Sequence, residues 1–333
     1  MKAAMIREYG QKNIEVAETA MPKIREKDVL VKIAAASINP IDLKTKDGKM
    51  KMLLTYKMPL ILGSDFSGTV MEVGEGVTDY LVGDKVYGRV QKDRIGTFSE
   101  YLAVAQTDIA LMPKNISYEE AAAIPLVGLT SYQALYEVMQ LTDQDKVLIQ
   151  AGSGGIGTIA IQLAKLSGAY VATTTSEKNA AFVKALGADK VIDYHKENFE
   201  DVLSEYDYVF DTMGGEILEK AFKIVKPKGK VVTLSGIPNR RFAQEYGLPI
   251  WKQGVLALAS RKFTKLAKAA DASYHFLFMR PDGQQLARLT ELIEDGKLRP
   301  IIDRVIPFDD IQTAFDYSAS GRAKGKIIIK MEN

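Results

Sequence analysis

The residues with the clearest chemical signature are three glycines in the run KVLIQAGSGGIG, which spans 146–157. Gly152, Gly154 and Gly157 have the spacing G-x-G-x-x-G, with a β-branched apolar run before them and an apolar run of helical spacing after them. In that context the first glycine allows a tight turn, the second lets the backbone approach a pyrophosphate, and the third lets a helix pack closely on a strand. The run therefore predicts a dinucleotide-binding turn.

The residues between these glycines, Ser153, Gly155 and Ile156, are expected to take part in the same site. The N-terminus of a helix supplies unpaired N–H groups and the positive end of a dipole, and both favour bound phosphate. The alternative is that the glycines only form turns in some other α/β fold. Strand, glycines, helix and second strand follow one another as a dinucleotide site requires, which favours binding.

The end of the next predicted strand, in the run VATTTSEK, favours NADP(H) over NAD(H). An NAD site places Asp or Glu there to bind the ribose hydroxyls. Thr174 stands at that position, and Thr174, Ser176 and Lys178 can all donate to a 2′-phosphate. Glu177 can be interpreted as a displaced ribose acid, but a place in a first helical turn, where the dipole favours an acid, explains it better.

The composition excludes several other classes of function. The 333 residues suffice for two domains. The formal net charge is +2 and no basic run forms a stripe, so no nucleic-acid partner is expected. The chain has no cysteine and only two histidines, His195 and His275, so we expect no metal. No segment has the pattern of a secretion signal or a membrane span, which predicts a cytoplasmic protein without a membrane partner.

Two patterns divide the chain. The first hundred residues are rich in β-segments such as 29–35 and 69–73, with weak helical spacing. From Glu119 on, strands and helices alternate, which indicates βαβ units on a parallel sheet covered on both faces. The predicted strands are 146–150, 170–174, 190–192, 208–211, 230–234 and 274–279, and the predicted helices are 119–124, 130–139, 156–166, 179–186, 216–224 and 284–295. The segment 249–272 is expected to be a helix with a loop, and 326–330 alternates like a sheet-edge strand.

Over essentially its whole length the chain resembles the medium-chain dehydrogenase/reductase superfamily, in particular its zinc-free quinone oxidoreductase and alkenal/enone reductase branch. The motifs that carry the resemblance are SINPIDLK at 37–44, ILGSDFSG at 61–68, LVGLTSYQAL at 126–135, AGSGGIG at 151–157, GADKVIDY at 187–194, VFDTMGG at 209–215 and GRAKGKIII at 321–329. The resemblance implies an α/β protein with a GroES-like β-barrel catalytic domain at 1–122 and 280–333, a Rossmann NADP-binding domain with a doubly wound parallel sheet at 123–279, and a homodimer.

Comparison with the zinc alcohol dehydrogenases of the same superfamily locates a lost metal site. Asn39 stands where those enzymes have their first cysteine ligand, Ser64 and Asp65 stand at the His-Glu position, and Leu126 or its neighbour replaces the second cysteine. Asp65 alone cannot hold a zinc ion that needs about four ligands. The resemblance therefore implies chemistry without zinc.

Without a metal, reduction of a quinone or of the C=C bond of an α,β-unsaturated carbonyl compound is easier than oxidation of an alcohol. The cofactor delivers the hydride, and the protein must hold the substrate oxygen with donors. The resemblance points to Lys44, Tyr56 and Asn39 as the catalytic candidates. A turn asparagine, a solvated lysine and a packed tyrosine are the structural alternatives.

Further cofactor contacts are expected from the resemblance and from the strand ends, where ligands bind in open α/β sheets. These candidates are Thr130, Tyr194, Ser235, Gly236, Ile237 and Lys326. The leading hypothesis is an NADPH-dependent reductase of a small electrophilic substrate. A dinucleotide-binding sensor without turnover is one alternative, since fold does not fix function. An acyl-thioester enoyl reductase is another, for which Arg240 and Arg241 would contact a phosphorylated carrier.

Overall fold

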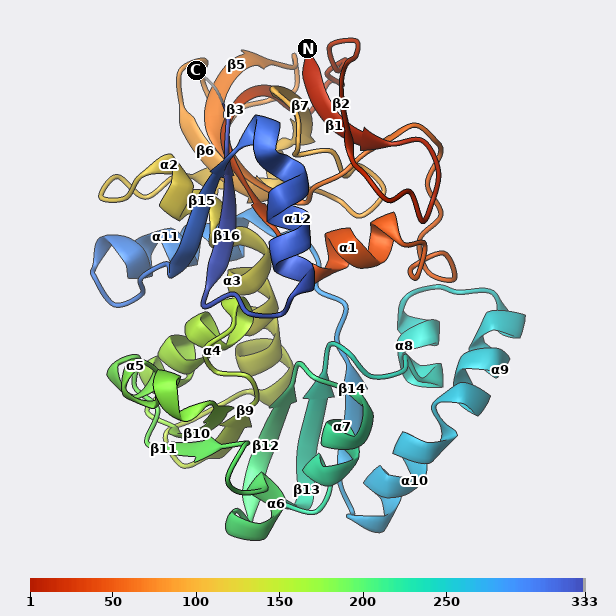
Figure 1. Ribbon diagram of the computed structural model, residues 1–333, viewed down its shortest axis with the longest axis vertical. Coiled ribbons are helices and arrows are strands. Elements are labelled where there is room, and N and C mark those ends of the chain that lie inside the picture. The colour runs from red at the N-terminus through yellow and green to blue at the C-terminus, as the bar shows by residue number, and fades with distance from the viewer. Residues whose placement is uncertain (332–333) are drawn as a thin grey trace. The chain divides into compact units, whose positions relative to one another are not determined.

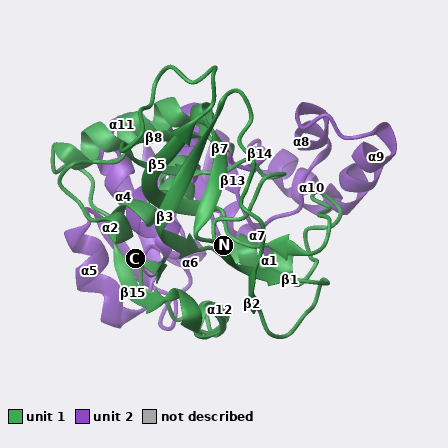
Figure 2. Ribbon diagram, turned by 90° about the horizontal axis from the view of Figure 1, so that it is seen from above, with its two compact units in different colours: residues 1–129, 280–333 green, residues 130–279 purple. Residues whose placement is uncertain are grey.

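A computed structural model describes residues 1–331 of the chain. The chain forms two compact units, Met1–Leu129 with Arg280–Asn333, and Thr130–Met279 (Figure 2). From the sequence, this division is predicted after residue 122. In the structure it falls inside helix α3 (Pro125–Tyr132), because this helix continues from one unit into the other.

The first unit is built around a seven-stranded sheet in the order β15-β16-β3-β5-β6-β8, with β7 paired to β3, and a three-stranded sheet in the order β2-β1-β4. Its strands are β1 (Lys2–Ile6), β2 (Glu15–Glu18), β3 (Asp28–Ile38), β4 (Leu60–Ile61), β5 (Asp65–Val73), β6 (Lys85–Arg89), β7 (Tyr101–Ala105), β8 (Ile109–Leu111), β15 (Ile302–Pro307) and β16 (Lys326–Lys330). Its helices are α1 (Pro40–Lys46), η1 (Gln106–Asp108), α2 (Tyr118–Ala122), α11 (Gly283–Glu294), η4 (Phe308–Asp310) and α12 (Ile311–Ala319). The strand-rich first hundred residues thus form a GroES-like sheet domain that the C-terminal segment completes (Figure 1).

One strand lies elsewhere than predicted. The alternation in 326–330 predicts an edge strand, but β16 pairs with β15 on one side and with β3 on the other. Lys326 and the three isoleucines after it are all buried, because both faces of the sheet are covered at this point. An interior strand in a covered sheet reads as a continuous apolar run, which the isoleucines supply.

The second unit is a six-stranded parallel sheet in the order β11-β10-β9-β12-β13-β14, which confirms the predicted doubly wound arrangement (Figure 1). Its strands are β9 (Lys146–Ile149), β10 (Tyr170–Thr175), β11 (Lys190–Asp193), β12 (Tyr206–Asp211), β13 (Val225–Thr233) and β14 (Ser273–Phe276). Its helices are η2 (Gln133–Met139), α4 (Gly155–Leu166), η3 (Glu177–Asn179), α5 (Ala180–Ala185), α6 (Phe199–Val202), α7 (Gly215–Ala221), α8 (Arg240–Glu245), α9 (Ile250–Ala259) and α10 (Arg261–Ala269).

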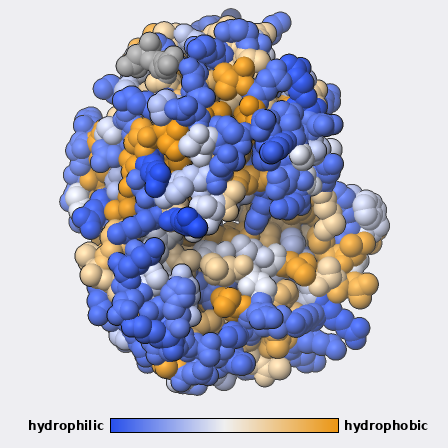
Figure 3. Space-filling view, viewed as in Figure 1, coloured by the Kyte–Doolittle hydropathy of each residue, from blue (hydrophilic) through white to orange (hydrophobic). Residues whose placement is uncertain are grey.

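The segment predicted as a helix with a loop forms α9 and α10, which meet at Ser260. Helix α10 buries Phe263 and Ala267 and leaves its lysines outside. Helix α9 is the reverse case, because it exposes large apolar side chains, among them Trp251 at 64% and Leu258 at 72%. Apolar residues accordingly gather on the surface where Figure 1 draws α9 (Figure 3). Within residues 1–331, no helix is both long enough and apolar enough to cross a bilayer.

Candidate cofactor and active site

The glycine-rich loop leaves the C-terminal end of β9 and enters α4, with Gly154 as the N-cap residue. The neighbouring strand β10 holds it in place through one residue. Thr174 accepts the Ala151 N–H on its Oγ1 at 3.1 Å and the Gly152 N–H on its carbonyl oxygen at 3.0 Å. Thr174, predicted to face the cofactor, is therefore also the anchor of the loop.

The space around each glycine shows which role it has. A Cβ on Gly157 would lie 2.4 Å from the Ala151 carbonyl oxygen, and one on Gly152 would lie 2.1 Å from Thr173 Oγ1, so both positions are filled by packing. A Cβ on Gly154 would meet only the Ala151 carbonyl oxygen, at 3.3 Å. The loop thus combines two close-packed glycines, one open glycine and a twelve-residue helix with its N-terminus at the loop. These features fit a dinucleotide pyrophosphate.

A cluster of neutral polar groups lies at the end of β10. Ser153 Oγ accepts from Thr175 Oγ1 at 3.0 Å and from Asn179 Nδ2 at 3.2 Å, and the same amide lies 3.4 Å from Ser176 Oγ. Ser153 and Ser176 are predicted from the sequence as cofactor residues. Thr175 and Asn179 are not, although both stand in the same polar run, TTTSEKN. Hydroxyl and amide donors of this kind fit a phosphate oxygen.

The two charged residues of this segment differ in their surroundings. Lys178 is exposed, and its ammonium can turn toward a bound phosphate. Glu177 is paired with Lys196, with 2.7 Å between Oε2 and Nζ. This pairing on the outside of the unit agrees with a surface role for Glu177 rather than with a ribose-binding acid.

The remaining predicted cofactor residues of the second unit follow strand ends. Ser235 Oγ donates to the Thr212 carbonyl oxygen at 2.8 Å, and the Gly236 N–H donates to Thr233 Oγ1 at 2.9 Å, which ties the turn after β13 to that after β12. Ile237 follows in the same turn. Tyr194 comes directly after β11 and is 60% exposed. All lie at the carboxyl edge of the parallel sheet, where ligands bind in this architecture. Thr130, in α3, is buried.

In the first unit, the positions of the lost metal site meet around Asp65, which is fully buried. Its carboxylate accepts from Ser37 Oγ at 2.8 Å, from Asn39 Nδ2 at 3.0 Å and from the Leu126 N–H at 2.9 Å. The structure thus brings Asn39, Asp65 and Leu126 together, as the comparison with the zinc enzymes implies. Over the described residues 1–331, no group of three or more His, Cys, Asp or Glu side chains is placed to hold a metal ion.

Lys326 reaches the same cluster from the start of β16. Its Nζ donates to Asn39 Oδ1 at 2.5 Å and to the Ile38 carbonyl oxygen at 3.2 Å, and lies 3.5 Å from Asp65 Oδ2. The residue is 4% exposed, and burial lowers the pKa of its ammonium. The sequence predicts a cofactor contact for Lys326. In the structure, the three N–H donors of its ammonium face these three acceptors, which all lie in the first unit.

A second buried carboxyl group, Asp42, completes the cluster. Its Oδ2 accepts the Asn39 N–H at 2.8 Å, and its Oδ1 lies 3.3 Å from Ser64 Oγ. Burial, and then the nearby charge of Asp65, raise the pKa of Asp42 to about 7. Asp42 therefore fixes the first turn of α1. This helix is not predicted from the sequence, although Asn39 followed by Pro40 is a common helix start.

The other two catalytic candidates occupy partly buried positions. Lys44 lies on α1, and burial, followed by the charge of Lys49, lowers the pKa of its ammonium. Tyr56 packs against the apolar core of the first unit, and its hydroxyl donates to the Lys92 carbonyl oxygen at 2.6 Å. Burial, and then Arg89, lower the pKa of the Lys92 ammonium to about 7. Lys92 has no motif around it, so its position cannot be predicted from the sequence.

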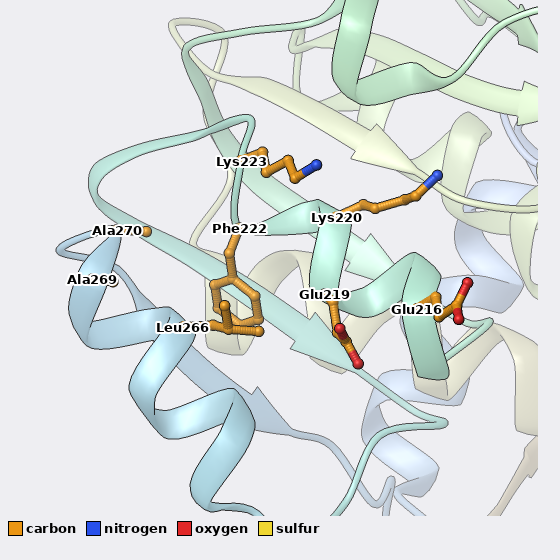
Figure 4. A pocket seen from close by; sticks show the side chains of 8 residues that line it. All are labelled: Glu216, Glu219, Lys220, Phe222, Lys223, Leu266, Ala269 and Ala270. Atoms are coloured by element: carbon orange, nitrogen blue, oxygen red, sulfur yellow. The ribbon is translucent and has the colours of Figure 1, made fainter.

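A pocket elsewhere in the second unit holds none of these residues. It lies between α7 and α10, where Phe222 and Leu266 approach each other and charged side chains of α7 form the rim (Figure 4). Its lining residues are Glu216, Glu219, Lys220, Phe222, Lys223, Leu266, Ala269 and Ala270.

Comparison with known proteins agrees with this architecture. Residues 25–114 match the alcohol dehydrogenase GroES-like domain, and residues 186–329 match a family described as zinc-binding dehydrogenase. The chain is 36% identical to the 2-methylene-furan-3-one reductase of Solanum lycopersicum, over 99% of this chain and 79% of that protein. It is 33% identical to the NADPH-dependent alkenal/one oxidoreductase, chloroplastic, of Arabidopsis thaliana, with the same coverage of 99% and 79%. The solved quinone oxidoreductase of Coxiella burnetii superposes with a TM-score of 0.85 at 32% identity, over 100% of this chain and 99% of that one.

The GroES-like unit and the parallel-sheet unit with its glycine-rich loop define a medium-chain dehydrogenase/reductase. At this identity over nearly its full length, the chain belongs to the zinc-free quinone oxidoreductase and alkenal/enone reductase branch of that superfamily.

Proposed function

We propose that the protein is an NADPH-dependent reductase of quinones or of the C=C bond of α,β-unsaturated carbonyl compounds, and that it works without zinc. The observation that carries the proposal is the dinucleotide loop whose neighbouring strand end, Thr174–Asn179, offers hydroxyls, an amide and Lys178 in place of a ribose-binding acid. The names of the two plant relatives supply the class of substrate and, for one of them, the cofactor.

The bound cofactor supplies a hydride to the electrophilic carbon of the substrate. The residues of the chain then have two tasks, to hold the cofactor and to stabilise the negative charge that develops on the substrate oxygen. The backbone N–H groups at the start of α4 hold the pyrophosphate. Lys44 and Tyr56 are the proposed donors to the substrate oxygen, because a fixed donor aimed at a developing charge lowers the barrier most. The Tyr56 hydroxyl would have to turn away from the Lys92 carbonyl oxygen in order to donate there.

The zinc-free part of the proposal rests on the side chains around Asp65. The ammonium of Lys326 lies 3.5 Å from this carboxylate, and its other neighbours are hydroxyl, amide and backbone groups. Zinc prefers Cys, His and carboxylate ligands and is repelled by a nearby cation. We therefore expect the purified protein to contain no stoichiometric zinc.

A substrate panel tests the function. NADPH consumption and product formation are measured with a quinone, an enal, an enone and an enoyl thioester, with NADPH binding measured separately. The proposal predicts turnover with a quinone, an enal or an enone. Tight NADPH binding without turnover of any of them would identify a sensor instead. A strong preference for the thioester would favour the acyl-thioester alternative, in which Arg240 is available and Arg241 is paired with Glu245 at 2.8 Å.

We also propose that the protein is a cytoplasmic homodimer. Strand β14 forms one edge of the six-stranded sheet, and a second copy could pair with it. The exposed apolar side chains of α9 provide further surface to bury. Light scattering of the purified protein tests the dimer, with Leu258→Asp as a surface variant, and cell fractionation tests the location.

A further inference from the structure

A buried ammonium group stands at the centre of the lost metal site. Lys326 Nζ has three acceptors, Asn39 Oδ1, the Ile38 carbonyl oxygen and Asp65 Oδ2. A lysine ammonium has three N–H donors, so this arrangement satisfies it completely. A buried charge without such partners would be strongly unfavourable. The position of Lys326 is therefore specified by its surroundings rather than adopted by chance.

On the basis of the function proposed above, we infer that Lys326 is a positioning residue for the reaction. Its ammonium is a fixed internal cation that takes over the structural task of the metal ion, holding Asn39 and the start of α1 so that Lys44 is presented to the substrate. Lys326 does so without contacting the cofactor.

The electrostatic part of the inference follows from the local count of charges. Asp65 and Asp42 are both buried, and the nearby cations are Lys326 and the buried Arg89. If Lys326 lost its charge, the buried Asp65 carboxylate would be left without its nearest cation. Breaking one side of a buried charge pair is far more costly than replacing both sides with neutral groups. The effect of a neutral residue at 326 should thus depend on whether Asp65 is charged.

The geometric part follows from what the cluster connects. Lys326 opens β16, Asn39 follows β3 directly, Asp65 opens β5, and the Leu126 N–H lies in the first turn of α3. The Asn39 carboxamide is held at both ends, since its oxygen accepts from Lys326 while its nitrogen donates to Asp65 and to the Ser37 carbonyl oxygen. Asn39 in turn precedes the helix that carries Lys44.

The experiment is a double-mutant cycle in the full-length protein with Lys326→Met, Asp65→Asn and both together. Arg322→Met, an exposed cation of the same C-terminal segment, is the matched control. Four quantities are measured: thermal unfolding, NADPH affinity, turnover with an enone, and the rate at which Lys44 is acylated by a lysine-labelling reagent. The labelling rate reports on the environment of Lys44 independently of catalysis.

We expect Lys326→Met to lower turnover by about 10- to 100-fold, as is typical when a supporting partner of a site residue is removed. NADPH affinity should change by less than about twofold, since no charge-assisted phosphate contact is lost. The labelling rate of Lys44 should change, and the double variant should recover most of the unfolding temperature lost by Lys326→Met. Arg322→Met should resemble wild type in all four quantities.

Two outcomes would overturn the inference. If Lys326→Met weakens NADPH binding tenfold or more with Lys44 labelling unchanged, Lys326 is a cofactor ligand. If the unfolding effects of the two single variants simply add, there is no charge coupling. If Lys326→Met fails to fold while the double variant folds, the coupling between Lys326 and Asp65 is as strong as it can be. If neither variant folds, the inference is overturned. A wild-type protein that reduces no enone defeats the proposed function, whereas unfolding and labelling still decide the role of Lys326.

Discussion

At the scale of single residues, the choice of cofactor depends on a strand end with no acid. Thr175, Asn179 and Ser153 form the neutral part of the proposed phosphate site, and the exposed Lys178 would supply the charge. We expect Lys178→Ala to weaken NADPH binding by about 1.5–3 kcal/mol, the size of a charge-assisted hydrogen bond. NADH binding should be nearly unchanged. Titration of both cofactors checks this, and Lys184→Ala, which removes an exposed charge from α5, is the control. Equal weakening of NADPH and NADH binding would contradict the assignment of Lys178 to the 2′-phosphate.

Lys44 is the residue for which turnover and cofactor affinity should separate. Its ammonium is partly buried on α1, and a desolvated cation acts more strongly on a developing oxyanion than a solvated one. Lys44→Ala should lower turnover by about 10²–10³-fold. NADPH affinity should stay close to wild type, and Lys23→Ala, which removes an exposed lysine elsewhere in the first unit, should leave both quantities intact. Undiminished reduction by Lys44→Ala would leave the reaction class standing and refute this residue assignment.

At the scale of elements, different glycines of the glycine-rich loop serve packing and ligand binding. Gly157→Ala should destabilise the fold by about 1–3 kcal/mol, as overpacking does, because its Cβ would lie 2.4 Å from the Ala151 carbonyl oxygen. Gly154→Ala should fold normally, since the nearest contact of its Cβ is at 3.3 Å, but should bind NADPH less well because the methyl group would take up space proposed for the pyrophosphate. Thermal unfolding and NADPH titration of both variants check this prediction. Normal NADPH binding by a well-folded Gly154→Ala would contradict the assigned role of that glycine.

The elements also show what the sequence can predict. The βαβ alternation and the glycine spacing locate the six parallel strands and the loop, because these signals are local. Helix α1 escapes prediction because it has only seven residues and its start is held by Asp42 and the cluster around Asp65. The partners of Lys326 cannot be predicted from the sequence for a similar reason. They lie 287 and 261 positions away along the chain, and no pattern in GRAKGKIII points to them.

At the scale of the whole molecule, the buried acid Asp42 should make stability depend on pH. Its pKa rises from 3.8 to about 7 in the folded chain, mainly through burial, with Asp65, Lys326 and Ser64 as its charged and polar neighbours. Between pH 3.8 and about 7, the folded state thus keeps a proton that the unfolded state releases. The stability that this proton contributes is fully present below pH 3.8 and is lost as the pH rises to about 7. Asp42→Asn should flatten that decline. Unfolding temperatures of both proteins across the window check this, because other titrating groups cancel in the difference. A slope identical to wild type would show that Asp42 is ionised throughout.

The proposed independence from zinc is a second property that belongs to the whole molecule. Exhaustive chelation should leave turnover unchanged, because Lys326 supplies the cation in the cluster around Asp65. Metal analysis of the purified protein should accordingly find no stoichiometric zinc. One tightly bound zinc per chain, lost together with activity, would contradict the proposal.

The central claim is that the chain transfers a hydride from NADPH to an electron-poor carbon. The most direct measurement uses NADPH deuterated at the reactive position of the nicotinamide, an enone and the wild-type protein, with the product analysed by mass spectrometry and NMR. We expect one deuterium on the carbon farther from the carbonyl group and a proton from water on its neighbour. An enone that is reduced without carrying deuterium at that carbon, or NADPH that is bound while the enone is recovered unchanged, would contradict it.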